Sequence, residues 1–92
     1  MKIKVQFFSS LINDFGGTEK EIELDGRPTI MSLLHRICDS NQRSRLIFDD
    51  SDKLRGSIQI FRNHKPIQSL EGTETLLEEG DIVAVLPAIY GG

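Results

Sequence analysis

The sequence predicts an α+β fold in which one main helix packs across one face of a small mixed sheet. Strand-like segments open and close the chain, at residues 2–8 and 81–87. One long helical pattern lies between them, at residues 29–41. No repeat or linker divides the 92 residues, a length that suits one domain with a modest core.

The first strand and its partner are predicted from residues 2–26. The segment KIKVQFF (2–8) alternates, which is the pattern of a strand with one buried face. Its two faces carry, in turn, Ile3, Val5 and Phe7, and Lys4, Gln6 and Phe8. The segment NDFGGTE (13–19) is rich in turn-forming residues, and EKEIELDG (19–26) reads as a second strand. We therefore expect a hairpin with a loop over residues 13–19.

The main helix follows that hairpin. Apolar residues recur at i, i+3, i+4 and i+7, as in an amphipathic helix, at Ile30, Leu33, Leu34 and Ile37. Thr29 is expected to cap its first turn, and Asn41 to end it. Residues 40–56 are mostly polar, so we expect a long connection that the apolar cluster at 46–48 holds against the core.

The remaining strands are expected after residue 56. The segment SIQIFRN (57–63) predicts a strand, and RNHKPI (62–67) a tight turn into a short strand. Pro66 restricts that short strand to a sheet edge, because proline cannot donate a ladder hydrogen bond.

A helical turn is expected around Leu76 and Leu77, closed by Gly80. The final segment DIVAVLP (81–87) is apolar on both faces. A strand of that kind is most easily placed in the middle of a sheet.

Composition excludes several classes of function. Net charge is −3 with both signs mixed along the chain, which argues against nucleic-acid binding. The single cysteine, Cys38, cannot form an intrachain disulfide and favours a reducing compartment. No apolar run reaches the roughly 20 residues of a membrane span, and the N-terminus lacks a signal-peptide pattern. We therefore expect a cytoplasmic protein that contacts neither nucleic acid nor membrane.

The chain finishes with LPAIYGG, which predicts a flexible tail at residues 88–92 beyond a folded domain at residues 1–87. Gly91 and Gly92 carry no side chains, so they could enter a narrow channel and bring a terminal carboxylate to another protein's active site. A carboxylate joined to AMP becomes a good acyl donor to a sulfur or amine nucleophile. The alternative is a frayed terminus whose glycines have no role.

These residues resemble the ubiquitin-like sulfur carriers, namely the small subunit of molybdopterin synthase and the thiamine-pathway carrier. They also resemble the archaeal small modifier proteins. The resemblance spans nearly the whole chain and rests on KVQFFSSL, TIMSLLHRI, DDSDKLRGSIQIFRN, GTETLLEEGDIVAVLP and the terminal YGG. Its most specific part is L-x(2)-GD-x-V-x(2)-LP-x(3)-GG, from Leu77 to Gly92.

The resemblance implies a ubiquitin-like β-grasp fold and a terminal glycine that a ubiquitin-activating-type enzyme adenylates with ATP and magnesium. The adenylate then becomes a sulfur-donating thiocarboxylate, or is coupled to a lysine of a target protein. Gly92 would be the reactive residue, with Gly91 and Tyr90 threading behind it. The chain would be a carrier, such as the non-catalytic small subunit of a synthase, with no bound cofactor or metal.

The family's exposed apolar docking positions fall on Phe8, near Pro66 and on Leu86. Strand parity independently places Phe8 outside the core, and Phe61 on the face of Gln59. Phe8, Phe61 and Leu86 are therefore expected to form an exposed apolar patch that a partner contacts. The alternative is that Phe61 or Leu86 packs beneath the long connection.

One departure from the family concerns the turn at Asn63 and His64, where many relatives have Asn-Gly. His64 would have to accept an unusual φ. The second proline that molybdopterin-type relatives often carry before the tail is replaced by Ala88, and Tyr90 is bulkier than usual. These differences concern the pathway more than the fold.

Other reactive residues read as structural. Cys38 is expected to be a half-buried small hydrophobe, because His35 and Arg36 point elsewhere on the helix. His35 and His64 lack metal-ligand spacing, and residues 49–56 lack the glycine and closing glutamate of a calcium loop. An acidic rim is expected near the tail, where it could meet a basic groove on a partner, at Glu71, Glu74, Glu78 and Glu79.

The sequence thus favours a sulfur carrier of the molybdopterin-synthase or thiamine type, monomeric when free. Its expected partners are an adenylating enzyme and a sulfur acceptor such as the molybdopterin synthase large subunit. A protein modifier, conjugated through Gly92 to target lysines, is the alternative. A plain interaction module with incidental glycines is the third reading.

Overall fold

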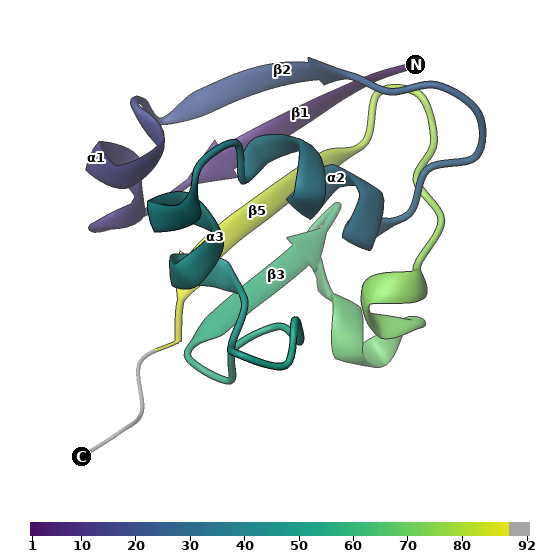
Figure 1. Cartoon of the computed structure of the whole chain (residues 1–92). Helices are drawn as coiled ribbons and strands as arrows, with labels where there is room; N and C mark the ends of the chain where they lie inside the picture. Colours follow the sequence, from purple (N-terminus) through teal and green to yellow (C-terminus); the bar gives the residue numbers. More distant parts are fainter. Residues whose placement is uncertain (89–92) are drawn as a thin grey trace.

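A five-stranded mixed sheet forms one layer of the computed structural model, which describes residues 1–88 (Figure 1). The strands lie in the order β2-β1-β5-β3-β4. Their bounds are β1 Lys2–Phe7, β2 Glu19–Glu23, β3 Ile58–Arg62, β4 Lys65–Pro66 and β5 Ile82–Pro87. β1 and β5 run parallel, and the other neighbouring pairs are antiparallel. With the helices on one side of this sheet, the α+β, β-grasp architecture predicted from the sequence is confirmed.

The central place of β5 follows from its two apolar faces. Val83 and Val85 are fully buried on the face covered by helices, whereas Ala84 and Leu86 are half-buried on the other. The alternation in β1 is also confirmed, with Ile3 and Val5 fully buried. Hydrogen bonds on both sides of β5 leave it no free edge, so the strand that ends at Pro87 is firmly held.

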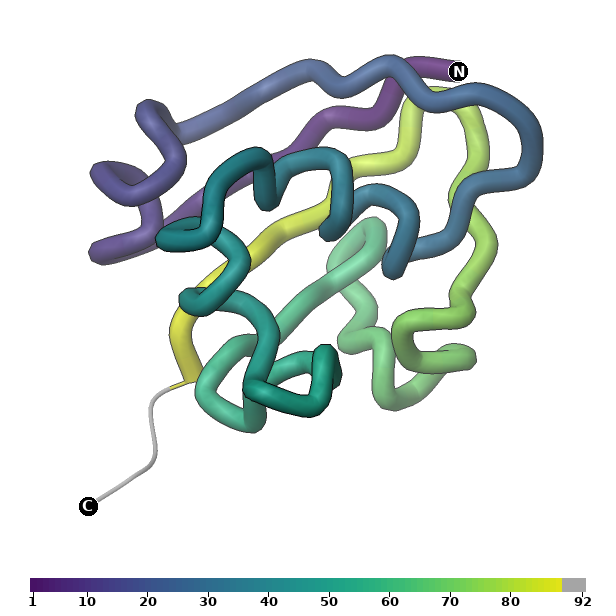
Figure 2. The backbone as a smooth tube through the Cα atoms, in the orientation of Figure 1, coloured from purple at the N-terminus to yellow at the C-terminus, as the bar shows by residue number. Residues whose placement is uncertain are grey.

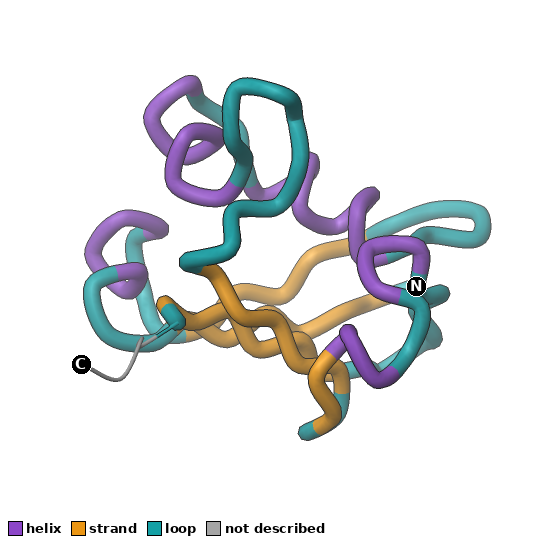
Figure 3. Tube along the Cα trace, turned by 90° about the horizontal axis from the view of Figure 1, so that it is seen from below, coloured by secondary structure: helices purple, strands orange, loops and turns teal. Residues whose placement is uncertain are grey.

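The main helix, α2, spans Ile30–Ile37 and packs the predicted apolar stripe against the sheet. Thr29 caps it as expected. The Thr29 side chain accepts from the Ser32 backbone N–H, and the Ser32 hydroxyl accepts from the Thr29 N–H, which makes a reciprocal capping box. Figure 3 shows the helices gathered on one side of the strands, which leaves the opposite side of the sheet open.

A second helix, α3 (Asn41–Ile47), replaces the long connection that the polar composition suggested. Asn41 therefore begins a helix and does not end one. The reason is local, since the Ser40 side chain caps the new helix by accepting from the Arg43 backbone N–H at 3.1 Å. The predicted anchor is confirmed, because Ile47 and Phe48 are buried in the core.

A third short helix, α1 (Leu11–Phe15), occupies part of the segment that we predicted as a loop. Phe15 is fully buried, and its ring stacks on Phe7 with centroids 4.6 Å apart. Gly16 ends the helix with φ of +81°, a left-handed conformation that glycine adopts without strain. Tertiary burial of Leu11 and Phe15 thus stabilises a helix too short to show a period in the sequence.

The helical turn predicted around Leu76 lies earlier, as two 3₁₀ helices, η1 (Ile67–Ser69) and η2 (Gly72–Glu74). The Thr75 hydroxyl fixes η2 by accepting from the Glu71 N–H and donating to the Gly72 carbonyl. Leu76 itself is extended and pairs with Thr29.

The described chain ends at Ala88, whose N–H donates to the Ser57 carbonyl at 2.7 Å. Residues 89–92 lie outside the described part of the chain. The boundary between a domain at 1–87 and a tail at 88–92 stays a prediction.

Candidate functional site

A shallow apolar hollow lies on the sheet face opposite the helices. Its volume is about 310 Å³, and its lining includes the predicted Phe8, Phe61 and Leu86. The full set of lining residues is Gln6, Phe8, Phe61, His64, Ile82, Ala84 and Leu86. Phe8 is 42% exposed, and Phe61 and Leu86 are half-buried. The structure therefore brings together three of the four expected docking residues.

The strand registers explain why these side chains meet. Gln6 of β1 pairs with Ala84 of β5, Ala84 pairs with Phe61 of β3, and Phe61 pairs with Pro66 of β4. Directly opposed residues share a face of the sheet, so this row crosses the open face from β1 to β4. Pro66, the fourth expected docking residue, is half-buried beside Phe61 but does not line the hollow.

The alternative in which Phe61 or Leu86 packs beneath residues 40–56 is wrong. Ile47 and Phe48, which anchor that segment, are buried in the core on the helix-covered side. Phe61 and Leu86 line the hollow on the opposite side. They are consequently available to a partner.

His64 is a lining residue that we did not predict. It occupies the β3–β4 turn with φ of +73°, after Asn63 with φ of +49°. Two consecutive residues with positive φ are typical of the two-residue turns that join the strands of a β-hairpin. His64 therefore does accept the unusual backbone conformation expected of it, and its ring is part of the hollow. Gln6, Ile82 and Ala84 could have been added by strand parity with Phe8 and Leu86.

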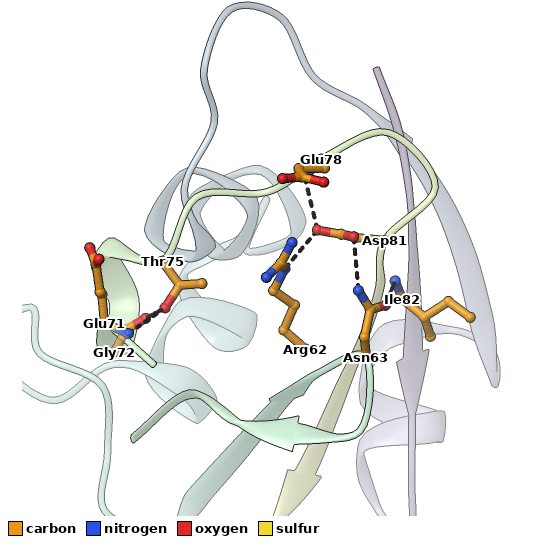
Figure 4. Close-up of polar contacts among 8 residues, drawn as sticks. All are labelled: Arg62, Asn63, Glu71, Gly72, Thr75, Glu78, Asp81 and Ile82. Carbon is orange, nitrogen blue, oxygen red and sulfur yellow. Dashed lines mark hydrogen bonds and ion pairs between the residues drawn. The ribbon is translucent and has the colours of Figure 1, made fainter. Parts of the chain in front are cut away.

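Asp81 joins the β3–β4 hairpin to the segment that precedes β5 (Figure 4). Its carboxylate is buried and accepts from the Arg62 Nε at 2.8 Å, the Asn63 Nδ2 at 2.9 Å and the Glu78 N–H at 2.8 Å. The Asn63 side-chain oxygen accepts from the Ile82 N–H. Burial works to raise the pKa of Asp81, but the hydrogen bonds from Arg62, Glu78 and Asn63 outweigh it, so the pKa lies below its ordinary value.

Cys38 has none of the surroundings of a reactive thiol. It is half-buried, and its Sγ donates to the Arg43 carbonyl at 3.7 Å. Burial, with a smaller contribution from Asp39, raises the pKa of Cys38 to about 11 despite the opposing charge of Arg43. The His35 ring stacks on Phe48, with centroids 5.0 Å apart.

Among residues 1–88, no group of three His, Cys, Asp or Glu side chains could hold an ion. In the calcium-like segment, the Asp49 carboxylate accepts from the Ser51 and Lys53 backbone N–H groups and so shapes a turn. Over the same described range, no helix has the length and apolar character needed to cross a membrane.

The acidic rim does not lie where we predicted it. Glu78 and Glu79 precede β5, whereas Ala88 follows it, so they occupy opposite ends of a six-residue strand. Figure 2 shows residues 70–80 on the far side of the molecule from the end of β5, the last strand of the described chain. Sequence proximity was misleading here because an extended strand advances about 3.3 Å per residue.

The predicted reactive and threading residues, Gly92, Gly91 and Tyr90, lie outside the described residues. The structure does fix where they begin. Ala88 directly follows Leu86 and Pro87, and Leu86 lines the apolar hollow. A partner that covers the hollow would therefore sit beside the root of the terminal segment.

The chain is similar to a known family over most of its length. The sequence model of the ThiS family matches residues 5–92. A comparison with curated proteins gives no match.

Solved structures give the same result. Small archaeal modifier protein 1 from Methanosarcina acetivorans is 33% identical, with a TM-score of 0.83 over 99% of this chain and 96% of that one. Small archaeal modifier protein 1 from Haloferax volcanii has a TM-score of 0.86 at 20% identity, over 100% of both chains. A Pyrococcus furiosus protein assigned as subunit 1 of the molybdopterin converting factor has a TM-score of 0.76 at 22% identity, over 97% of this chain and 99% of that one.

Proposed function

The chain belongs to the ThiS family of ubiquitin-like carriers, and on that premise we propose that Gly92 is adenylated and converted to a sulfur-donating thiocarboxylate. The observation that carries the proposal is the extent of the family match, which runs through Gly91 to Gly92. That extent favours a role for the terminal glycines over the alternative of an incidental frayed end.

The chemistry needs an activated acyl group. In the proposed sequence, an oxygen of the Gly92 carboxylate attacks the α-phosphorus of ATP, pyrophosphate leaves, and a glycyl adenylate forms. A hydrosulfide equivalent then attacks the acyl carbon, the bond to AMP breaks, and AMP leaves with its oxygen. The product is a thiocarboxylate. Gly92 offers that attack no steric obstacle, because it has no side chain.

The chain supplies position and the partner supplies catalysis. We assign ATP and magnesium to the activating enzyme, and the role of carrier to this chain. The family match supports that division, because the family is one of ubiquitin-like carriers. We expect the chain to be monomeric when free and to meet these partners in the cytoplasm.

The hollow around Phe8, Phe61 and Leu86 is the proposed contact for the activating enzyme. It is the open apolar face nearest the root of the terminal segment. Burying it would fix β5 against the enzyme, while residues beyond Ala88 supply the reach to the nucleotide. Pro66 extends this contact at the sheet edge, next to Phe61.

The acceptor that we propose is a molybdopterin synthase large subunit. Support comes from the fold, which is shared with the Pyrococcus furiosus converting-factor subunit.

The test of the thiocarboxylate is the intact mass of the protein isolated with its sulfur-supplying machinery active. The account predicts a gain equal to the exchange of one oxygen for one sulfur, absent when Gly92 is deleted. A mass that never changes, under conditions in which the activating enzyme works on another carrier, would contradict it.

A second candidate is protein modification, in which a lysine amine attacks the same adenylate and forms an isopeptide bond. The 33% identity to the Methanosarcina acetivorans modifier favours it. Its signature is Gly-Gly remnants on lysines of cellular proteins after protease digestion. These remnants should vanish when Gly92 is deleted. Their presence together with the thiocarboxylate would assign both roles to one activated intermediate.

A further inference from the structure

Leu76 is an exposed hydrophobic residue that the proposed function does not use. Among the described residues, the large hydrophobic side chains that stand out as exposed are Phe8, at 42%, and Leu76, at 45%. Phe8 belongs to the open sheet face. Leu76 lies between η2 and β5. Figures 1 and 2 show that this segment lies away from the end of β5.

The backbone fixes this exposure. The Thr75 carbonyl accepts from the Ile30 N–H at 2.9 Å, and the Leu77 N–H donates to the Pro28 carbonyl at 2.9 Å. Thr75 and Leu77 are both buried, at 5% and 4% exposure. Leu76 lies between them in an extended segment, so its side chain must point to the opposite side, towards solvent.

A hollow of about 290 Å³ lies beside Leu76 and combines apolar and acidic side chains. Leu70 and Leu76 supply its apolar part, and the exposed Glu71 and Glu78 supply carboxylates. The described residues give neither glutamate side chain an ion-pair partner.

The cation in the wall of this hollow is already engaged. Arg62 donates to Asp81 at 2.8 Å, and Figure 4 shows its guanidinium directed at that carboxylate. The hollow therefore presents net negative charge around an apolar centre. A second hollow across Leu76 shares Glu78 and also contains the exposed Arg27, which balances that carboxylate, so the excess negative charge lies on the Leu70 side.

We propose that Leu70, Leu76, Glu71 and Glu78 form a second docking surface, which binds a partner segment carrying an aliphatic side chain flanked by lysine or arginine. The aliphatic side chain packs against Leu70 and Leu76. The flanking cations pair with Glu71 and Glu78, whose charges select a basic partner over an acidic one. Because this surface lies apart from the Phe8 face, the segment binds while an activating enzyme holds that face.

The probe for this surface is a synthetic peptide with a Leu-Leu pair flanked on each side by Lys and Arg, titrated into the full-length isotopically labelled chain. We expect saturable amide shift changes concentrated in residues 70–78 and at Arg62. Two matched peptides serve as controls, one with Glu in place of each cation and one with Gly in place of each Leu. Both should bind at least about tenfold more weakly.

Protein variants complete the test. Leu76→Ser and the double change Glu71→Gln with Glu78→Gln should each lower the affinity for the peptide by about tenfold or more, with an otherwise unchanged spectrum. The Phe8→Ser variant should bind the peptide with the affinity of the wild type. The proposal is overturned by peptide shifts that fall on the Phe8 face, by equal binding of the Gly-substituted peptide, by an unaffected Leu76→Ser variant, or by no saturable shifts. We expect Gly92 adenylation to be unaltered in Leu76→Ser, so that either proposal can fail alone.

Discussion

At the scale of single residues, Asp81 is the polar group on which the fold depends most. Its carboxylate accepts from Arg62, Asn63 and the Glu78 N–H, and thereby joins the β3–β4 turn to the segment before β5. Asp81→Ala leaves those three donors without their acceptor and empties a buried site. We expect it to lower the free energy of unfolding by about 2–4 kcal/mol, measured by denaturant titration. Asp50→Asn, a change at an exposed loop carboxylate, should have little effect and serves as the control.

The pH dependence of stability tests the same residue. The pKa of Asp81 is lower in the folded chain than in the unfolded one, so its contribution is present above the unfolded pKa and is lost as pH falls through the folded pKa. The difference in unfolding free energy between wild type and Asp81→Asn should therefore narrow as the pH drops below about 4. A difference that stays constant down to acid pH would mean that the Asp81 charge contributes nothing.

Cys38 gives a prediction about the place of the sulfur. With a pKa of about 11, its thiol is almost entirely protonated at neutral pH and reacts slowly. Iodoacetamide should modify the native chain at pH 8 far more slowly than the denatured chain. Cys38→Ser should load sulfur like the wild type. Loss of the thiocarboxylate in that variant would show that sulfur loading depends on Cys38 and not on Gly92 alone.

Some of these residues could be predicted from the sequence, and others could not. Strand parity placed Phe8, Phe61 and Leu86 on one face, because a side chain's face in a strand depends only on its position. The role of Asp81 was out of reach, because its partners Arg62 and Asn63 come from another strand and turn, 19 and 18 residues earlier. No local pattern records such a pairing.

At the scale of elements, the β3–β4 turn carries strain that a substitution can relieve. His64 has φ of +73°, which costs a residue with a Cβ about 1–2 kcal/mol, whereas glycine accepts it freely. Part of that gain is lost to the greater freedom of glycine in the unfolded chain. We expect His64→Gly to raise the free energy of unfolding by about 0.5–1 kcal/mol. His64→Val should lower it, and the reverse order would contradict the assigned turn.

The long periodic elements were predictable, and the short ones were not. β1, β5 and α2 have periods of two or 3.6 residues that persist long enough to be read. Helices α1 and α3 span five and seven residues, and depend on burial of Phe15 and on the Ser40 cap. Burial stabilises α1, and a local cap together with burial of Ile47 stabilises α3, so neither helix shows a period long enough to predict from the sequence.

At the scale of the whole molecule, the exposed residues Phe8 and Leu76 belong to two separate surfaces. Phe8→Ser should reduce the efficiency (kcat/KM) with which an activating enzyme adenylates the chain by about tenfold or more, because it removes an aromatic anchor. Stability should change by less than about 1 kcal/mol, since Phe8 is 42% exposed. Leu76→Ser, equally exposed but distant, is the matched control and should be adenylated normally. Equal efficiencies for the two variants would contradict the proposal that the activating enzyme contacts the Phe8 face.

The architecture is consistent with the proposed function, in which a carrier domain takes part in acyl chemistry. β5 is hydrogen-bonded on both sides, its half-buried Leu86 faces the open hollow, and the terminal residues follow from its end. A strand hydrogen-bonded on both sides thus connects the proposed docking face to Ala88, where the described chain ends. The same strand places the acidic residues Glu78 and Glu79 at its other end.

ATP–pyrophosphate exchange by an adenylating enzyme from the same organism tests the central claim most directly. With magnesium and ATP present, the account predicts rapid exchange when the intact chain is added, and background exchange when the chain is shortened to end at Tyr90. The shortened chain keeps the described fold and the Phe8 face, so it should still compete with the intact chain for the enzyme. Exchange that continues undiminished with the shortened chain would show that Gly92 is not the group that is activated.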